Sequence, residues 1–313
     1  MKKISLHRGV MLTAMLAMSV SGVAQNNKQY LDSTVTAGSK YVFAYNSKGN
    51  NTSYIYYRWD KESSDWKESG KSDYAYDDKG NQTSYISYTW YKESSEWVKF
   101  RKYEYAYDNK GNQTSYILYT CDKGSSEWVK YRKYEYTYNN KGNRTSEMSY
   151  TWDKEINDWK KYRKVDYTYD NKGKQTSEIF YYWNKGNDWK KDEKNESTYD
   201  NKGNLISRTY YILNKKSNDW VKIGKSDYMY DDNGNQTESI SYAWEPGISD
   251  WVKYRKSEFT YNLSYSKEDL VVPIEYANNP LFLGNMLTGD TGYLLSGTDW
   301  TQNGTTTYYW SSR

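Results

Sequence analysis

A glycine recurs along most of the chain at nearly constant spacing, and this repeat restricts the fold more than any other feature. Successive copies are 31 residues apart, with one interval of 30, and they are Gly49, Gly80, Gly111, Gly142, Gly173, Gly203 and Gly234. Aligned on these glycines, seven units begin at Lys40, Lys71, Lys102, Lys133, Lys164, Lys194 and Lys225. An eighth unit starts at Lys256 and breaks off after Asn262. Such a period is typical of proteins in which each unit stacks on its neighbours.

Each unit contains two turn signals separated by alternating sequence. In the turn around Gly111, glycine falls where a three-residue hairpin loop needs a left-handed residue. The second turn, as at residues 92–95, is short, polar and rich in serine. Stretches of about 10 to 12 residues between the turns alternate in character, as strands do. The unit is therefore predicted to be a β-hairpin, and the chain an all-β antiparallel meander of about 15 strands.

Pairing across the two turns predicts the register and the faces of the sheet. Pairing directly across the glycine turn places Tyr103 opposite Ile117, and pairing the tryptophans across the serine-rich turn places Glu147 opposite Lys164. Strict alternation puts Trp97 on the same face as Tyr103. Open sheets of more than about ten strands curl, split or flatten. We therefore expect a long curved or spiralling sheet with the Trp/Tyr face inside the curve; a flat layer is the alternative.

The repeats occupy residues 40–262, between two segments that do not follow the pattern. Residues 25–39 form an N-terminal lead-in, and residues 263–313 are predicted to form a small C-terminal cap with a last hairpin of its own. No break in the repeat is seen before Leu263.

The first 24 residues have the three parts of a secretory signal peptide. These are basic Lys2, Lys3 and Arg8, an apolar run, and small residues up to Ala24, with cleavage expected before Gln25. We therefore expect an exported protein that is secreted, held at the cell surface or kept in the periplasm. The apolar run is too short to span a membrane, and both strand faces carry charges, so a membrane-spanning protein is not expected.

Composition excludes several kinds of chemistry. The chain has 44 basic and 40 acidic residues, and removing the signal leaves 41 against 40, without the basic excess of a nucleic-acid-binding protein. The only histidine, His7, lies in the signal, and the only cysteine is Cys121, which takes a position filled by tryptophan in most other units. These counts exclude histidine-dependent catalysis, an intrachain disulfide and a Cys/His metal site. Lysine inside most glycine turns argues against calcium there, so no metal, cofactor or catalytic residue is predicted.

Tryptophan stands at the two feet of the serine-rich turn. The chain is 19% aromatic, which is unlike a disordered chain. The candidate binding residues are Trp59, Trp66, Trp90, Trp97, Trp128, Trp152, Trp159, Trp183, Trp189, Trp220, Trp244 and Trp251. Rows of indole and phenol rings can stack against sugar rings along an extended repeat surface. The alternative is that these rings form the core in place of missing aliphatic side chains.

The string from Tyr105 to Thr114, with the pattern Y-x-Y-[DN]-x-K-G-N-x-T, resembles the YD repeat of Rhs and teneurin-type proteins. The resemblance covers roughly Lys40 to Asn262, although the unit here is longer than the usual YD unit. It implies β-hairpins stacked into a curved sheet or shell with extracellular, carbohydrate-binding or encapsulating roles. The signal and the repeat together are also similar to uncharacterised secreted repeat proteins of Bacteroidetes-type bacteria.

Together these features predict a non-enzymatic extracellular scaffold that binds glycan or another surface polymer. Its partner would be a polysaccharide or a cell-surface protein. The alternative is a purely structural surface or spacer protein with no small-molecule ligand. An enzyme would need a site outside the repeat, near Glu268 or Asp290.

Overall fold

The computed structural model describes residues 28–91, 94–122, 126–273, 276, 279–282 and 284–312, so the predicted signal peptide lies outside the described residues. This part of the chain consists of nineteen strands, two short 3-10 helices and their connections. The strands of the first half are β1 (Gln29–Val35), β2 (Ser39–Tyr45), β3 (Asn51–Asp60), β4 (Asp65–Tyr76), β5 (Gln82–Tyr91), β6 (Glu96–Tyr107), β7 (Gln113–Cys121), β8 (Trp128–Tyr138), β9 (Arg144–Asp153) and β10 (Asp158–Tyr169). The remaining elements are β11 (Gln175–Trp183), β12 (Trp189–Tyr199), β13 (Leu205–Leu213), β14 (Trp220–Tyr230), β15 (Gln236–Glu245), β16 (Asp250–Asn262), η1 (Lys267–Asp269), β17 (Leu270–Val271), η2 (Pro280–Phe282), β18 (Met286–Ser296) and β19 (Asp299–Ser312).

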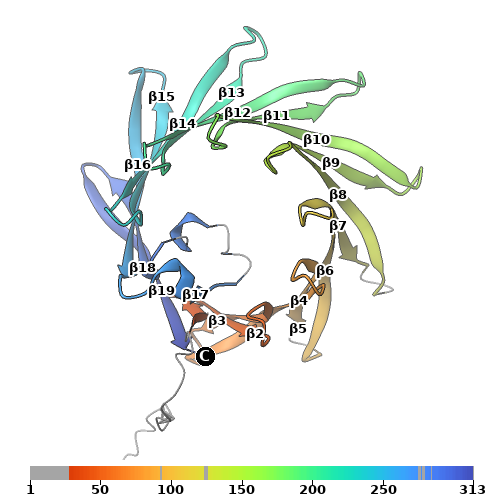
Figure 1. The fold of residues 1–313 in the computed structure, drawn as a ribbon, viewed down its shortest axis with the longest axis vertical. Helices are drawn as coiled ribbons and strands as arrows, with labels where there is room; N and C mark the ends of the chain where they lie inside the picture. Colours follow the sequence, from red (N-terminus) through yellow and green to blue (C-terminus); the bar gives the residue numbers. More distant parts are fainter. Residues whose placement is uncertain are drawn as a thin grey trace, which may run out of the picture.

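The meander closes on itself. β1 pairs with β2 on one side and with β19 on the other, so the ring of Figure 1 is a barrel of 18 antiparallel strands. The predicted all-β antiparallel meander is confirmed, and its curvature continues to full closure. Closure pairs the two edge strands with each other and leaves no open edge in the ring.

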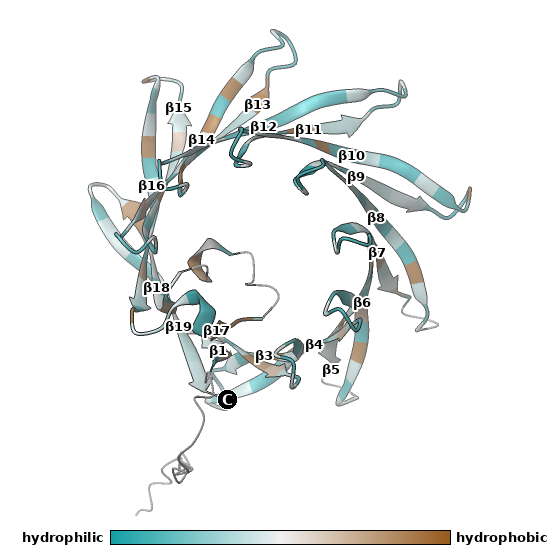
Figure 2. Cartoon of the chain, viewed as in Figure 1, coloured by the Kyte–Doolittle hydropathy of each residue, from teal (hydrophilic) through white to brown (hydrophobic). Residues whose placement is uncertain are grey.

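The glycine turns have the predicted hairpin geometry. Gly111 has φ +84° and donates its N–H to the carbonyl of Asp108 at 3.1 Å. The carboxylate of Asp108 accepts the N–H groups of Lys110 and Asn112, each at 2.9 Å. The serine-rich turns end on a residue with positive φ, for example Ser95 at 54°. Figure 2 shows that these glycine turns are hydrophilic and surround one mouth of the barrel.

A β-bulge beside each glycine turn shifts the register. Tyr107 pairs with Gln113 but Ala106 pairs with Ser115, so Thr114 is an extra residue on its strand. The predicted pair was therefore wrong by one position, because Tyr103 lies opposite Leu118 and not Ile117. A bulge inserts one unpaired residue and increases the local twist.

A second bulge lies on the wall side of each serine-rich turn. In the β9–β10 pair Tyr162 is the extra residue, and Glu147 consequently lies opposite Val165 rather than Lys164. Phe100 is the corresponding extra residue in β6. Because it separates Trp97 from Tyr103, these two side chains lie on opposite faces of the sheet. The expectation of one shared Trp/Tyr face was wrong: the tyrosine face lines the barrel and the tryptophans stand outside it.

The inner face is identified by the segment that folds into the barrel. The ring of Phe43, which aligns with Tyr105 of a later repeat, contacts that of Tyr276 at a centroid distance of 6.1 Å. Tyr276 belongs to the chain between β16 and β18, which enters the ring in Figure 1. Leu31, Phe43, Phe282 and Leu287 form the buried core where this segment meets the wall.

The region after the repeats supplies both the inner segment and the last two strands of the barrel. β17 pairs in parallel with β1, through Gln29 with Leu270 and Tyr30 with Val271. The predicted last hairpin is β18–β19, and its strands complete the wall between β16 and β1. The described residues after Asn262 thus contribute to the ring as well as filling part of its interior.

Neighbouring repeats are joined by a tyrosine hydroxyl on the inner face. Tyr107 donates its hydroxyl to the carbonyl of Gln82 at 2.8 Å, and Tyr138 donates to that of Gln113 at 2.7 Å. The same bond recurs between successive hairpins around the ring, as from Tyr76 to Asn51. Each bond satisfies a carbonyl at the point where the bulge interrupts the ladder.

Candidate functional site

The outer wall carries a repeated set of one lysine, one acid and one tyrosine. Lys102 Nζ lies 2.5 Å from the carboxylate of Glu104, and the Tyr119 hydroxyl donates to the same carboxylate at 2.7 Å. The hydrogen bond from Lys102 lowers the pKa of Glu104, while burial raises the pKa of Tyr119 to about 12. The lysine and the acid of each set face one another, so this part of the wall is electrostatically satisfied.

The hairpins leave the wall beyond the second bulge. Strands β4 and β5 pair only up to Gly70 and Thr89, whereas β3 and β4 remain paired as far as Asp60 and Asp65. Each serine-rich turn is therefore the tip of a two-stranded hairpin that projects outward, as Figure 1 shows. The twelve predicted tryptophans are all at these tips.

The tryptophans form edge-to-face pairs across each complete tip. Trp90 and Trp97 have ring centroids 4.9 Å apart and an interplanar angle of 69°. The other pairs are Trp59–Trp66, Trp152–Trp159, Trp183–Trp189 and Trp244–Trp251. In two hairpins the partner position is Cys121, opposite Trp128, or Leu213, opposite Trp220. The prediction that Cys121 replaces a packing tryptophan is consistent with this register.

The exposure of the indoles lies between that of a buried core and that of an exposed binding platform, the two predicted alternatives. Trp59 is 39% exposed and the other eleven are half-buried. They are therefore neither the closed core of the molecule nor a fully open platform. The edge-to-face contact packs each pair, and the remaining ring surface faces the neighbouring hairpin or solvent.

A lysine of one tip lies over an indole of the next in most repeats. Lys130 Nζ is 4.3 Å from the ring centroid of Trp152, and Lys161 Nζ is 4.4 Å from that of Trp183. This lysine stands three residues before the lysine that opens the following repeat. In the first repeat the equivalent residue is Glu68.

A cleft of about 710 Å³ lies between the first two tips, where Glu68 replaces the lysine. Its aromatic walls are Trp59 and Trp66 of β3–β4 and Trp90 of β5. The polar lining residues are Arg58, Asp60, Lys67, Glu68, Ser69 and Thr89. Aromatic faces beside carboxylates, cations and hydroxyls can hold a polyol by stacking and by directed hydrogen bonds. The sequence contained the signal for this site, because Glu68 breaks the repeat at that position.

The inner wall of the first half of the barrel is a continuous ladder of tyrosines. The rings of Tyr85 and Tyr103 have centroids 5.2 Å apart, and those of Tyr116 and Tyr134 are stacked at 4.4 Å. The position of Tyr85 and Tyr116 is occupied by Glu147, Glu178 and Arg208 in the next three repeats. The repeat therefore does change before Leu263, on the wall that faces the lumen.

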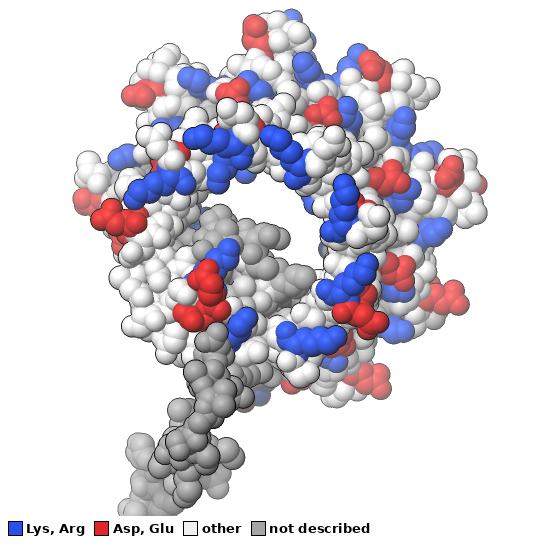
Figure 3. All heavy atoms as spheres, in the orientation of Figure 1, with Lys and Arg blue, Asp and Glu red and all other residues white. Residues whose placement is uncertain are grey.

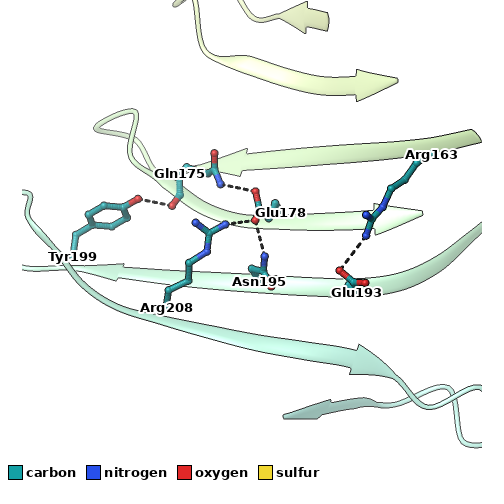
Figure 4. Close-up of polar contacts among 7 residues, drawn as sticks. All are labelled: Arg163, Gln175, Glu178, Glu193, Asn195, Tyr199 and Arg208. Atoms are coloured by element: carbon teal, nitrogen blue, oxygen red, sulfur yellow. Dashed lines mark hydrogen bonds and ion pairs between the residues drawn. The ribbon is translucent and has the colours of Figure 1, made fainter. Parts of the chain in front are cut away.

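Figure 4 shows the ionic cluster that replaces the ladder. The carboxylate of Glu178 accepts hydrogen bonds from Asn195 at 2.6 Å and Gln175 at 3.2 Å, and it pairs with Arg208. Its side chain is 11% exposed. A buried carboxylate needs such partners, because desolvation of an unpaired charge is costly.

Two further ion pairs belong to this part of the lumen. Arg163 contacts Glu193 at 3.0 Å, and Arg144 contacts Glu147 at 3.6 Å. Burial raises the pKa of Glu147, and Arg144 opposes that shift. Each acid of the cluster is held by an arginine, which gives the pairs a structural role in the wall.

Within the described ranges, no group of three or more His, Cys, Asp or Glu side chains is placed to hold a metal ion. Among the same residues, no helix has the length and apolar character required to cross a membrane.

Comparison with known proteins finds no matching family model and no matching curated protein. A solved protein of unknown function from Bacteroides fragilis is 21% identical over 38% of this chain and 87% of its own, with a TM-score of 0.34. A porin-like protein from Bacteroides uniformis is 10% identical over 92% of this chain and 100% of its own, with a TM-score of 0.44. A Photorhabdus luminescens Tc holotoxin pore structure is 12% identical over 88% of this chain and 15% of its own, with a TM-score of 0.34. These likenesses concern β-structure alone, and no functional conclusion rests on them.

Proposed function

We propose that this chain is an exported, non-enzymatic barrel scaffold that binds a glycan in the cleft between its first two hairpin tips. The supporting observation is the cleft itself, with three indoles on its walls and carboxylates beside them. Glu68 matters because the other repeats place a lysine at this point, and in several of them it lies over the next indole. The proposal keeps the carbohydrate-binding role implied by the YD-repeat resemblance and assigns it to one site.

The central experiment changes Glu68 to the residue that other repeats have there. Glu68→Lys is expected to abolish retention of the protein by polysaccharide in affinity electrophoresis, because the lysine would occupy the cleft and cover Trp90. The melting temperature should change little, since the same lysine is accommodated in later repeats. Trp90→Ala should also abolish retention.

The matched control is Lys99→Glu, which makes the converse change in the next repeat. It leaves the first cleft intact, so its retention should equal that of the unmodified protein. Equal retention of Glu68→Lys and the unmodified protein would contradict the proposal, as would a failure of the protein to bind any polysaccharide in a broad panel.

A second function, a structural surface or spacer protein, is favoured by the edge-to-face packing of the indoles. These pairs hold hairpin tips that have no neighbouring strand beyond Gly70 and Thr89. In that case Trp90→Ala lowers the melting temperature and no polymer is retained by any variant.

A further inference from the structure

The arginines of the barrel are concentrated on its inner wall. Six of the seven within the described residues occupy wall positions on the face of the tyrosine ladder, namely Arg101, Arg132, Arg144, Arg163, Arg208 and Arg255. The seventh, Arg58, lines the tip cleft. The lysine that follows four of the six wall arginines directly, as Lys102 follows Arg101, points outward. At these positions the arginine lies on the inner face and the lysine next to it lies on the outer face.

Three of these arginines form an arc. Arg101, Arg132 and Arg163 take the same position in successive repeats, on β6, β8 and β10. Positions two strands apart are separated by about 10 Å across a sheet. Arginine at such positions presents a planar fork that binds carboxylates through two parallel hydrogen bonds.

The guanidinium groups of the arc are held in place by aromatic rings. Arg101 lies 4.9 Å from the ring centroid of Phe100, and Arg132 lies 4.7 Å from that of Tyr162. Arginine stacked in this way keeps its N–H edge free for a ligand.

Two members of the arc have no acid to satisfy them. The described arginines that form ion pairs are Arg144, Arg163 and Arg208. Within the described part of the chain, Arg101 and Arg132 form none, and Nε of Arg132 is buried without a hydrogen-bond partner. Arg101 is exposed and occupies a position on the face of the tyrosine ladder. Arg132 is half-buried and hydrogen-bonded to Tyr134, so the exposed Arg101 has the larger unused capacity for an anion and Arg132 adds positive charge beside it.

The wall around the arc is rich in hydroxyl groups. Ser87 lies opposite Arg101. Tyr103 and Tyr134 follow Arg101 and Arg132 by two residues on the same face. A ligand that offers carboxylates and hydroxyls at regular intervals complements this surface.

The tyrosine faces argue against a single-stranded nucleic acid. Tyr116 and Tyr134 are stacked on each other at 4.4 Å, and Tyr103 contacts Tyr116 at 5.9 Å. Bases bind such walls mainly by stacking on free aromatic faces. Here the faces of these rings are occupied by neighbouring rings, so they leave little aromatic surface for bases.

The arc is also accessible along the barrel. Figure 3 shows an open passage through the middle of the ring. The inner segment packs against Phe43, Tyr308 and Trp310, on the side of β2 and β19, and Figure 1 shows β6–β10 across the ring from it.

We propose that the arginine arc of the lumen is a binding site for an acidic polysaccharide, whose carboxylates are held by Arg101 and Arg132. This site differs from the tip cleft in its wall, its charge and its ligand class. Binding here does not depend on Glu68 or Trp90.

The test measures binding of polygalacturonate by isothermal titration, with neutral dextran as the comparison polymer. The R101Q/R132Q variant is expected to lose about tenfold or more in affinity, because two charge-assisted contacts are removed. R101K/R132K should lose affinity as well, because an ammonium group cannot form the bidentate contact. The matched control is K102Q/K133Q, which removes the same charge from adjacent residues on the outer face and should bind nearly as well as the unmodified protein.

A second measurement needs no variant. Bound polygalacturonate should protect Arg101 and Arg132 from modification by phenylglyoxal, as followed by mass spectrometry. The proposal is overturned if R101Q/R132Q and K102Q/K133Q lose the same affinity for polygalacturonate, or if neither arginine is protected. It is also overturned if the protein binds dextran, or oligodeoxythymidylate as a single-stranded nucleic acid, as tightly as it binds polygalacturonate. Glu68→Lys should retain polygalacturonate binding, so failure at this site and failure at the tip cleft are distinguishable.

Discussion

At the scale of single residues, the barrel depends on polar groups of tyrosine that a sequence pattern shows only as aromatic. The last tyrosine of each strand that enters a glycine turn donates its hydroxyl to a carbonyl of the preceding hairpin, as Tyr107 does to Gln82. Burial raises the pKa of Tyr107, so the hydroxyl remains protonated and able to donate across the physiological range. The hydroxyl of Tyr107 thus satisfies a carbonyl beside the bulge.

Tyr107→Phe tests this role. Removal of the hydroxyl leaves the Gln82 carbonyl without its donor and should lower the free energy of unfolding by about 0.5 to 1.5 kcal/mol. Equilibrium denaturation in urea measures the difference. Tyr131→Phe is the matched control, because Tyr131 is an exposed bulge residue and its change should have almost no effect. Equal losses for the two variants would contradict the assignment.

At the scale of elements, the weakest part of the ring is its seam. β1 pairs with β2 through only three residue pairs, Ser33–Val42, Thr34–Tyr41 and Val35–Lys40. The seam is supported instead by the core, in which Leu31 is 0% exposed. The repeats form a curved sheet by their own pairing, and β18, β19 and β1 complete the ring between β16 and β2.

Leu31→Ala should therefore open the seam before the rest of the ring. Removal of a fully buried leucine costs about 2 to 5 kcal/mol, and here the loss falls on the strand with the shortest pairing. Hydrogen exchange should increase first in β1 and β19, with little change in β6 and β7. Leu118→Ala is the control, since Leu118 is also buried but lies in β7. An increase in β1 exchange that is the same for both variants would argue against a local seam.

At the scale of the whole molecule, the outer wall is stabilised by the ring of lysine, acid and tyrosine sets. Hydrogen bonds from lysine lower the pKa values of Glu104, Glu196 and Glu258 below the ordinary value of 4.5. A carboxyl group with a lower pKa in the folded state binds fewer protons there than in the unfolded state. It therefore contributes stability above its unfolded pKa and loses that contribution as the pH falls through the folded pKa.

Replacement of Glu104, Glu196 and Glu258 by Gln should lower the melting temperature at pH 7 and reduce its further fall between pH 6 and pH 3. The groups are partly exposed, so each effect is modest and the combined variant is needed. Scanning calorimetry across this pH range gives the comparison. Gln at the exposed turn glutamates Glu62 and Glu155 is the control, and an acid response identical to that of the triple variant would contradict the prediction.

The sequence by itself determined the repeat, the hairpin and the antiparallel meander. These follow from local backbone requirements: Gly111 supplies a positive φ, and alternation of side chains specifies a strand. The tryptophans could be located in the same way, because they flank the serine-rich turn directly in the sequence. Positions within a repeat can be read from one copy because the turn and its two strands are close in sequence.

The tertiary structure alone decided the faces, the closure and the cleft. The extra residue Phe100 moves Trp97 to the outer face, and strict alternation cannot show where such a bulge falls. Closure requires pairing of Gln29 with Ser312, from the two ends of the described chain, which no local pattern encodes. The cleft at Glu68 forms because neighbouring tips diverge, and this depends on the curvature of the whole ring. The faces of the sheet, the closure of the ring and the cleft depend on long-range pairing and accumulated twist rather than on turn chemistry.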